Sequence, residues 1–304
     1  MTIFTLLITN LFPLYIIIAL GYIGGRYMQL NLESIARILI FMLQPIVAFG
    51  AVSRIDFQPE YLALPFVIAG ASAVIAVSSH VLSRKIFSAK RSCLIGMASA
   101  SGNTGYFGLP VIMALFGPDA IGIYLMINLG IQISESTLAY YLGARGEHTV
   151  TESLKRVFRL PSIYAMALGL LVNFTGLNLP DIFYTYWDHA TGAWIIFGMM
   201  LIGIALGKTA PLQFNWRLNA WLGGVKFIVW PLAVLSLITL DRHVLHLFDA
   251  DIHKMFLVIG IVPLPGNVVA YAAQLNVHPE ETAMAVLLST LFALVYIPVV
   301  FLFF

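Results

Sequence analysis

Two short stretches combine hydrogen-bonding side chains with helix breakers, although both lie inside long apolar runs. The first, SASGNTGYFGLP at residues 99–110, contains Asn103, and the second, VPLPGNVVAY at residues 262–271, contains Asn267. The prolines in these stretches are Pro110, Pro263 and Pro265. An asparagine side chain both donates and accepts hydrogen bonds, so the pair suits an oxygen-rich substrate or ion.

The prolines are expected to interrupt both helices, because proline lacks a backbone donor and clashes with the preceding turn. Broken backbone survives in lipid only where protein or a water-filled cavity covers it. The N-terminal ends of half-helices carry partial positive charge, which favours an anionic group such as a carboxylate. One such helix alone is more often merely kinked, but two at matching positions favour a site. The predicted substrate-binding residues here are Asn103, Thr104, Gly105 and Asn267.

Glu135 is an acidic residue whose burial in a membrane would be costly, because it lies within the apolar stretch NLGIQISESTLAYY. Such an acid must be paired, protonated or bound to a cation, so Glu135 is a functional candidate, with a buried structural ion pair as the alternative. Gln132 and Ser136 share its helix face. Lys226, in AWLGGVKFIVWP, is a candidate partner. It would pair with Glu135, act as the counter-charge of an anion, or snorkel to the membrane surface.

Gln44, followed by Pro45, is expected to line the same cavity from another helix, although the LQP sequence is also consistent with a simple kink. Gly203 and Gly207 form a small-residue face that permits close helix contact, either within the chain or in a dimer.

Enzymatic and metal-binding functions receive little support. No HExxH, phosphate-binding loop or Ser/His arrangement at one depth occurs, so neither an enzyme nor direct use of ATP is expected. The single cysteine, Cys93, excludes an intrachain disulfide and a cysteine-based zinc site. One loop gathers histidines and acids at irregular spacing, which favours a solvated loop over a metal site. These residues are His243, His246, Asp249, Asp251 and His253.

The composition is that of a polytopic helical membrane protein. Hydrophobic residues make up 60% of the 304 residues and charged residues 10%, and the mean hydropathy is +0.93. A soluble domain carries about 25% charged residues. Apolar runs near the length needed to cross a bilayer predict ten spans. They are residues 4–25, 34–52, 61–83, 92–116, 118–142, 161–176, 189–207, 217–240, 252–275 and 281–303.

The distribution of lysine and arginine predicts the orientation. Four alternate connections carry two, four, four and two cations, whereas the opposite connections carry Arg54, Arg242 and Lys254 alone. The crowded side is expected to be cytoplasmic, which places both termini outside. The N-terminal stretch lacks a basic region and a cleavage motif, so we interpret it as a retained helix.

Ten spans divide into two sets of five with inverted topology, because five is odd. The first repeat covers residues 1–143, a cytoplasmic linker covers 144–160, and the second repeat covers 161–304. The interrupted fourth and ninth spans occupy matching positions. This arrangement is typical of secondary transporters, whose substrate site lies at mid-membrane between the repeats.

With GNTGYFGLPVIMALFG and PLPGNVVAYAAQ, the chain resembles the auxin efflux carrier family, including bacterial relatives of plant PIN proteins. The resemblance implies the fold of sodium/proton antiporters and bile-acid symporters. In that fold, spans 1, 2, 6 and 7 form a scaffold, and spans 3–5 and 8–10 form a mobile transport domain. It also implies a homodimer that carries organic anions, with broken spans 4 and 9 crossing. The crossover positions would be Asn103, Pro110, Pro263, Pro265 and Asn267.

We therefore expect a secondary-active, elevator-type carrier of a small organic anion, such as malonate, malate or an auxin-like acid, in the bacterial inner membrane. Its partners would be the anion, the bilayer and a second copy of the chain, with no nucleic acid. No cofactor is expected beyond a coupling proton or sodium ion. A cation/proton antiporter that uses Glu135 is the alternative, and a non-transporting membrane sensor is a weaker one.

Overall fold

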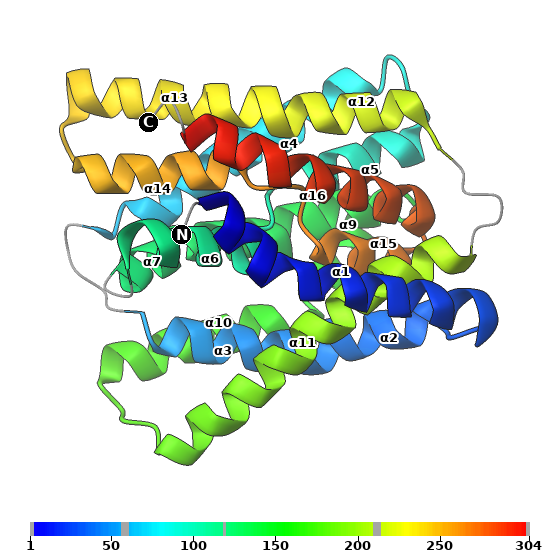
Figure 1. Cartoon of the computed structure of the whole chain (residues 1–304), viewed down its shortest axis with the longest axis horizontal. Coiled ribbons are helices and arrows are strands. Elements are labelled where there is room, and N and C mark those ends of the chain that lie inside the picture. Colours follow the sequence, from blue (N-terminus) through cyan, green and yellow to red (C-terminus); the bar gives the residue numbers. More distant parts are fainter. Residues whose placement is uncertain (1–2, 56–60, 118–119, 209–213, 302–304) are drawn as a thin grey trace.

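The computed structural model describes residues 3–55, 61–117, 120–208 and 214–301 (Figure 1). These residues contain helices and no strand. The α-helices are α1 (Ile3–Tyr27), α2 (Leu32–Ile38), α3 (Gln44–Ser53), α4 (Leu64–Ser83), α5 (Ala89–Ser99), α6 (Leu109–Phe116), α7 (Ile121–Ser134), α8 (Tyr140–Ala144), α9 (Val150–Val157), α10 (Pro161–Thr175), α11 (Asp181–Lys208), α12 (Trp216–Gly224), α13 (Trp230–Leu240), α14 (Ala250–Ile261), α15 (Asn267–Leu275) and α16 (Pro279–Phe301).

Short π-helical segments interrupt several of these helices. They are η1 (Leu39–Leu43), η3 (Thr104–Gly108), η5 (Glu135–Ala139), η6 (Val225–Val229) and η7 (Asp241–Leu245). Such segments are frequent at functional sites, and each rotates the following helix face relative to an unbroken α-helix. Three of them, η3, η5 and η6, begin at or next to a residue singled out by the sequence.

The length and composition of the helices fit a multi-pass membrane protein. Within the described residues, five helical stretches are long and apolar enough to cross a membrane, and a sixth is added if the bent pair α9–α10 counts as one span. The five are Leu32–Ser53, Leu64–Ser83, Asp181–Lys208, Trp216–Leu245 and Pro279–Val300. The ten-span inverted repeat stays a prediction.

The fourth and ninth expected spans are each divided. α5 ends at Ser99 and α6 begins at Leu109, while α14 ends at Ile261 and α15 begins at Asn267. Pro110 does not make the first break, which lies at residues 100–103. It stands in the first turn of α6, directly after the π-helical segment η3.

The helices form two groups with the broken helices between them (Figure 1). α2, α3, α10 and α11 gather on one side, and α4, α12 and α13 lie on the other. α1 packs along α11, and α3 packs along α10. The α1–α11 contact is close because Gly203 and Gly207 face the backbone of α1, where an added Cβ would collide with the carbonyls of Ile18 and Tyr22. The small-residue face therefore serves packing within the chain.

Ion pairs fasten the predicted cytoplasmic ends of the helices. Arg91 of α5 donates two hydrogen bonds to Glu281 in the first turn of α16, at 2.8 and 3.0 Å. Lys90 pairs with Glu147 in the connection after α8, and its hydrogen bond lowers the pKa of that carboxyl. α5 is thus held at its predicted cytoplasmic end as well as at its break.

Candidate functional site

The two breaks meet through their main chains. The backbone N–H of Asn103 donates to the carbonyl of Pro263 at 2.8 Å. The carbonyl of Asn103 in turn accepts from Phe107 and Gly108. Four helix ends therefore converge at one point, the C-terminal ends of α5 and α14 and the N-terminal ends of the η3–α6 segment and α15.

The negative ends of the half-helices are satisfied by donors on the η6–α13 stretch. Trp230 Nε1 donates to the carbonyl of Ser99 at 2.9 Å, and Lys226 Nζ donates to the carbonyl of Ile259 at 3.2 Å. The positive N-terminal ends, at residues 103–105 and 265–267, instead line a cavity. The cavity thus faces the ends of the broken helices that attract anions.

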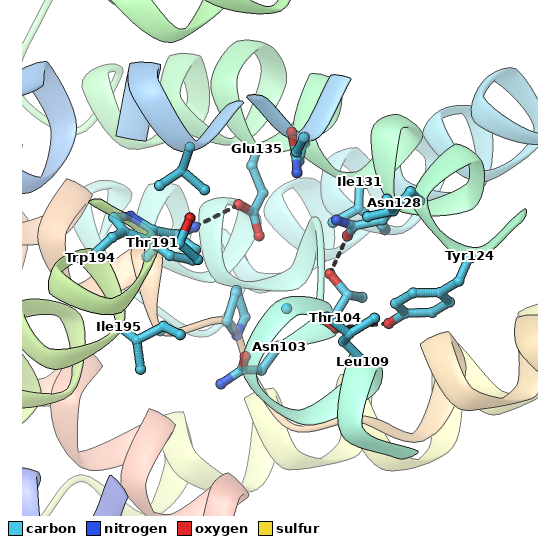
Figure 2. Close-up of a pocket in the computed structure, with 18 of the residues that line it drawn as sticks. Asn103, Thr104, Leu109, Tyr124, Asn128, Ile131, Glu135, Thr191, Trp194 and Ile195 are labelled. Carbon is cyan, nitrogen blue, oxygen red and sulfur yellow. Dashed lines mark hydrogen bonds between the residues drawn. The ribbon is translucent and has the colours of Figure 1, made fainter. Parts of the chain in front are cut away.

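This cavity has a volume of about 520 Å³ and lies between the two breaks, α7, α3 and α11. Figure 2 shows its centre: Thr191, Trp194 and Ile195 of α11 stand opposite Thr104 and Asn128, and the Glu135 carboxylate points into the space from a third side. Most of its wall is apolar, with a few polar groups. This composition is typical of sites for small organic ligands.

Two hydrogen bonds hold the polar groups on one side of the cavity wall. Thr104 Oγ1 donates to Asn128 Oδ1 at 2.5 Å, and the Tyr124 hydroxyl donates to the Thr104 carbonyl at 2.8 Å. Gly108 must be a glycine because a Cβ there would collide with the Tyr124 hydroxyl. This side of the wall is therefore rigid.

Glu135 links the two breaks. Its Oε1 accepts from the hydroxyl of Ser101 at 2.7 Å, and its Oε2 accepts from Asn267 Nδ2 at 3.1 Å. Ser101 belongs to the first break and Asn267 opens α15 after the second. Glu135 itself is buried, with 6% of its surface exposed. A change in its protonation therefore alters a hydrogen bond to each of the two breaks.

Two polar atoms of the cavity wall lack partners. Gln132 Oε1 and Thr191 Oγ1 are buried and make no hydrogen bond in the described part of the chain. An unpaired buried polar atom costs about 1–3 kcal/mol, so such atoms in a cavity wall indicate that a bound ligand or water completes them.

A second, smaller cavity of about 40 Å³ adjoins Glu135 and is lined by Gln44, Ser136 and Trp194 as well as by residues of the main cavity. Gln44 lies here and not in the lining of the main cavity. Its Nε2 donates to the Tyr271 hydroxyl at 2.7 Å, which joins the start of α3 to α15. The space is large enough for an ordered water molecule.

Lys226 does not pair with Glu135. Among the described residues no carboxylate lies within 4.0 Å of its ammonium group, which is fully buried 4.6 Å from the centre of the Trp230 ring. It lies behind Gly102, whose added Cβ would come within 2.5 Å of Nζ. Because Gly102 lines the cavity, the lysine charge stands directly behind the cavity wall. It does not snorkel.

The histidine-rich loop is only partly the solvated segment expected. His253 is buried in α14, and its Nε2 lies 2.8 Å from Asp241 Oδ2. Asp241 also accepts from the backbone N–H groups of Leu247 and Phe248. The described residues contain no group of three or more potential metal ligands.

Sequence reasoning missed the contribution of α11 and of the end of α3. Trp187, Thr191 and Trp194 line the cavity, and Trp187 Nε1 donates to the Val47 carbonyl at 3.1 Å. Arg54 lines the mouth, with its guanidinium 4.0 Å from the Tyr184 ring centre and 4.6 Å from that of Trp187. Tryptophan and threonine in an apolar span give no signal by type alone, because which way they face depends on helix rotation.

Comparison with known proteins identifies relatives at modest identity. No family model matches the chain. A protein of Methanocaldococcus jannaschii, named an uncharacterized transporter, is 26% identical over 236 residues, which cover 73% of this chain and 76% of the relative. An uncharacterized transporter of Methanothermobacter thermautotrophicus is 22% identical over 203 residues, 66% of this chain and 64% of the relative. The similarity to these proteins and the apolar helices together support a multi-pass membrane transporter.

Proposed function

We propose that this protein is a secondary-active carrier of a small organic anion. The observation that carries the proposal is the cavity at the crossing of two broken helices, where the N-terminal ends of two half-helices line the same space. Two of its lining residues, Gln132 and Thr191, each have a buried polar atom without a partner in the described structure. Asn103, Thr104, Gly105 and Asn267 bind the anion there. Glu135, with Gln132 and Ser136 beside it, holds a coupling ion or proton.

The carrier works by an elevator movement of the auxin efflux carrier type. α11, which contributes Trp187, Thr191 and Trp194, forms part of the static scaffold, and the crossing and Glu135 belong to the moving domain. The packing of the helices supports the inverted repeat. The symmetry of such a repeat exchanges the first span with the sixth and the second with the seventh. It therefore matches the α1–α11 contact with the α3–α10 contact. The protein functions as a homodimer in the inner membrane, with both termini outside.

Proteoliposome flux tests this function. Radiolabelled malonate, malate and indole-3-acetate are offered separately under imposed pH or sodium gradients, with protein-free liposomes as the background. Asn103→Ala is expected to abolish flux, and Glu135→Gln to abolish its dependence on the gradient. Ser236→Ala is the matched control, because this exposed hydroxyl bonds only to the carbonyl of Leu232 within its own helix. Absence of flux for every anion refutes the proposal.

A cation/proton antiporter is the second candidate, favoured by a buried carboxylate that connects both breaks. It predicts exchange of protons for sodium that needs Glu135 and no organic anion. The same liposomes distinguish the two functions, because the antiporter acidifies or alkalinises the lumen on a sodium gradient alone. Saturable binding of an anion with no flux would instead indicate a sensor.

A further inference from the structure

Two buried groups of opposite charge stand on either side of the cavity wall without touching. We propose that they fix the coupling of this carrier: each turnover moves one proton together with one anion, and protonated Lys226 is the counter-charge of the bound anion. This inference rests on the proposed transport function and adds to it the identity of the coupling ion and the ratio.

Lys226 is placed to act on the anion through the wall. Its Nζ is held by the carbonyl of Ile259 and lies against Gly102, which lines the cavity. A Cβ at position 102 would come 2.5 Å from Nζ and 2.7 Å from Val262 Cγ2, so glycine lets Lys226 lie directly against this backbone. Backbone alone therefore separates the ammonium group from the ligand. A charge so close and so poorly hydrated is not screened by salt as a surface charge is.

Glu135 is placed to exchange a proton with the cavity. It lines both the main cavity and the small one behind it, so it separates two spaces that can each hold water. In the ionised form its two oxygens accept from Ser101 and Asn267. In the protonated form the new O–H needs an acceptor, and Gln132 Oε1, one turn earlier on the same face and lining the same two cavities, is an acceptor without a partner.

The other titratable groups around this carboxyl do not duplicate its role. Tyr124 of α7 lines the cavity, and Tyr271 of α15 lies near Glu135 and accepts from Gln44. Arg54 of α3 lines the mouth, against two aromatic rings. Tyrosine hydroxyls are neutral and arginine is charged throughout the physiological range, so neither takes over the proton exchange assigned to Glu135.

The coupling follows from counting charges in the moving domain at the crossing. With the site empty, ionised Glu135 and Lys226 cancel, and the domain crosses without net charge. A bound monovalent anion adds one negative charge, which a proton on Glu135 removes. Every other occupancy leaves a net charge in a medium of low dielectric constant, which is strongly unfavourable. The two neutral forms are therefore the ones that move.

A proton fits this site better than a sodium ion does. The donors that hold Glu135 are one hydroxyl and one amide nitrogen, whereas hard cations require a shell of several oxygen ligands. Sodium coupling would satisfy the same charge count, so the experiment must separate the two ions.

The test measures anion and proton fluxes together, in proteoliposomes that contain a pH indicator and whose voltage is set by potassium and valinomycin. Indole-3-acetate is expected to enter with one proton per anion and with a rate independent of voltage, after subtraction of the flux into protein-free liposomes. Malonate, a dianion at neutral pH, leaves one net negative charge on the loaded site even when Glu135 is protonated, so it should enter more slowly than indole-3-acetate and at a rate that depends on voltage. Flux that needs sodium, moves no proton, or carries charge with indole-3-acetate overturns the inference while leaving the transport function intact.

Variants add a second readout. In Glu135→Gln the loaded form is neutral but the empty form carries the Lys226 charge, so flux should lose its proton and become voltage-dependent. Unchanged proton movement in this variant overturns the role given to Glu135. Lys226→Gln should weaken anion binding at least tenfold, and Lys226→Arg should retain more binding than Lys226→Gln. Equal binding by all three proteins overturns the counter-charge role. No flux or binding in the wild type refutes the proposed function itself.

Discussion

Thr191→Val is expected to change stability and ligand affinity in opposite directions. The Thr191 hydroxyl lies in the cavity wall, is buried, and has no partner in the described structure. Valine has the same shape without the hydroxyl, and its helix propensity is similar. The substitution therefore removes one unpaired polar group and leaves the packing of α11 unchanged.

The size of each effect follows from the hydrogen bond that is missing. Without ligand, the wild type carries the cost of an unpaired buried hydroxyl, so the variant should be equally stable or more stable by up to about 3 kcal/mol. With ligand, the wild type gains a neutral hydrogen bond worth about 0.5–1.5 kcal/mol, which the variant cannot form. The dissociation constant should therefore rise about 2- to 13-fold.

Thermal unfolding in nanodiscs, with indole-3-acetate or malonate titrated into each protein, measures both effects. The variant should unfold at the same or a higher temperature without ligand and should gain less stability at each ligand concentration. Thr185→Val, on an exposed turn of the same helix, is the control and should change neither quantity. A destabilised variant without ligand would show that Thr191 is structural, and unchanged affinity would show that no ligand group reaches it.

Two further predictions concern the frame around the site. Gly203→Ala should destabilise the protein by about 1–3 kcal/mol because its Cβ collides with α1, whereas Gly192→Ala in the same helix meets open space and should be neutral or stabilising by up to about 1 kcal/mol. Equal thermal unfolding of the two variants would refute the packing argument. Glu281→Gln removes the charge that Arg91 binds twice and should cost about 1–3 kcal/mol. Glu280→Gln, beside it and outside the ion pairs of the described residues, is the control for chemical denaturation.

The sequence predicted the parts of the site whose residue types are unusual in an apolar helix. Asn103 and Asn267 stand next to helix breakers in matching positions, and Glu135 and Gln132 are too polar for their surroundings. The structure brings all four to one cavity. These residues could be recognised as site candidates from their chemistry rather than from any periodicity, because a polar group in lipid is costly wherever it points.

The remaining features depended on helix rotation, which apolar sequences do not encode clearly. The π-helical segments η5 and η6 begin at Glu135 and just before Lys226, and each shifts the faces that follow. A depth argument alone therefore suggested a Glu135–Lys226 pair, whereas the structure turns the lysine toward the carbonyl of Ile259. The first break lies at residues 100–103, ahead of Pro110, and Pro110 directly follows the π-helical segment η3.

The hydrogen bond between the N–H of Asn103 and the carbonyl of Pro263 has a consequence for how the two halves of such a chain diverge over time. Both atoms belong to the main chain, so among single substitutions only proline at position 103, which lacks the N–H group, removes this joint between the two breaks. Each half is free to accumulate substitutions while the joint keeps its geometry. The crossing of the two breaks therefore depends less on side-chain identity than the cavity wall around it does.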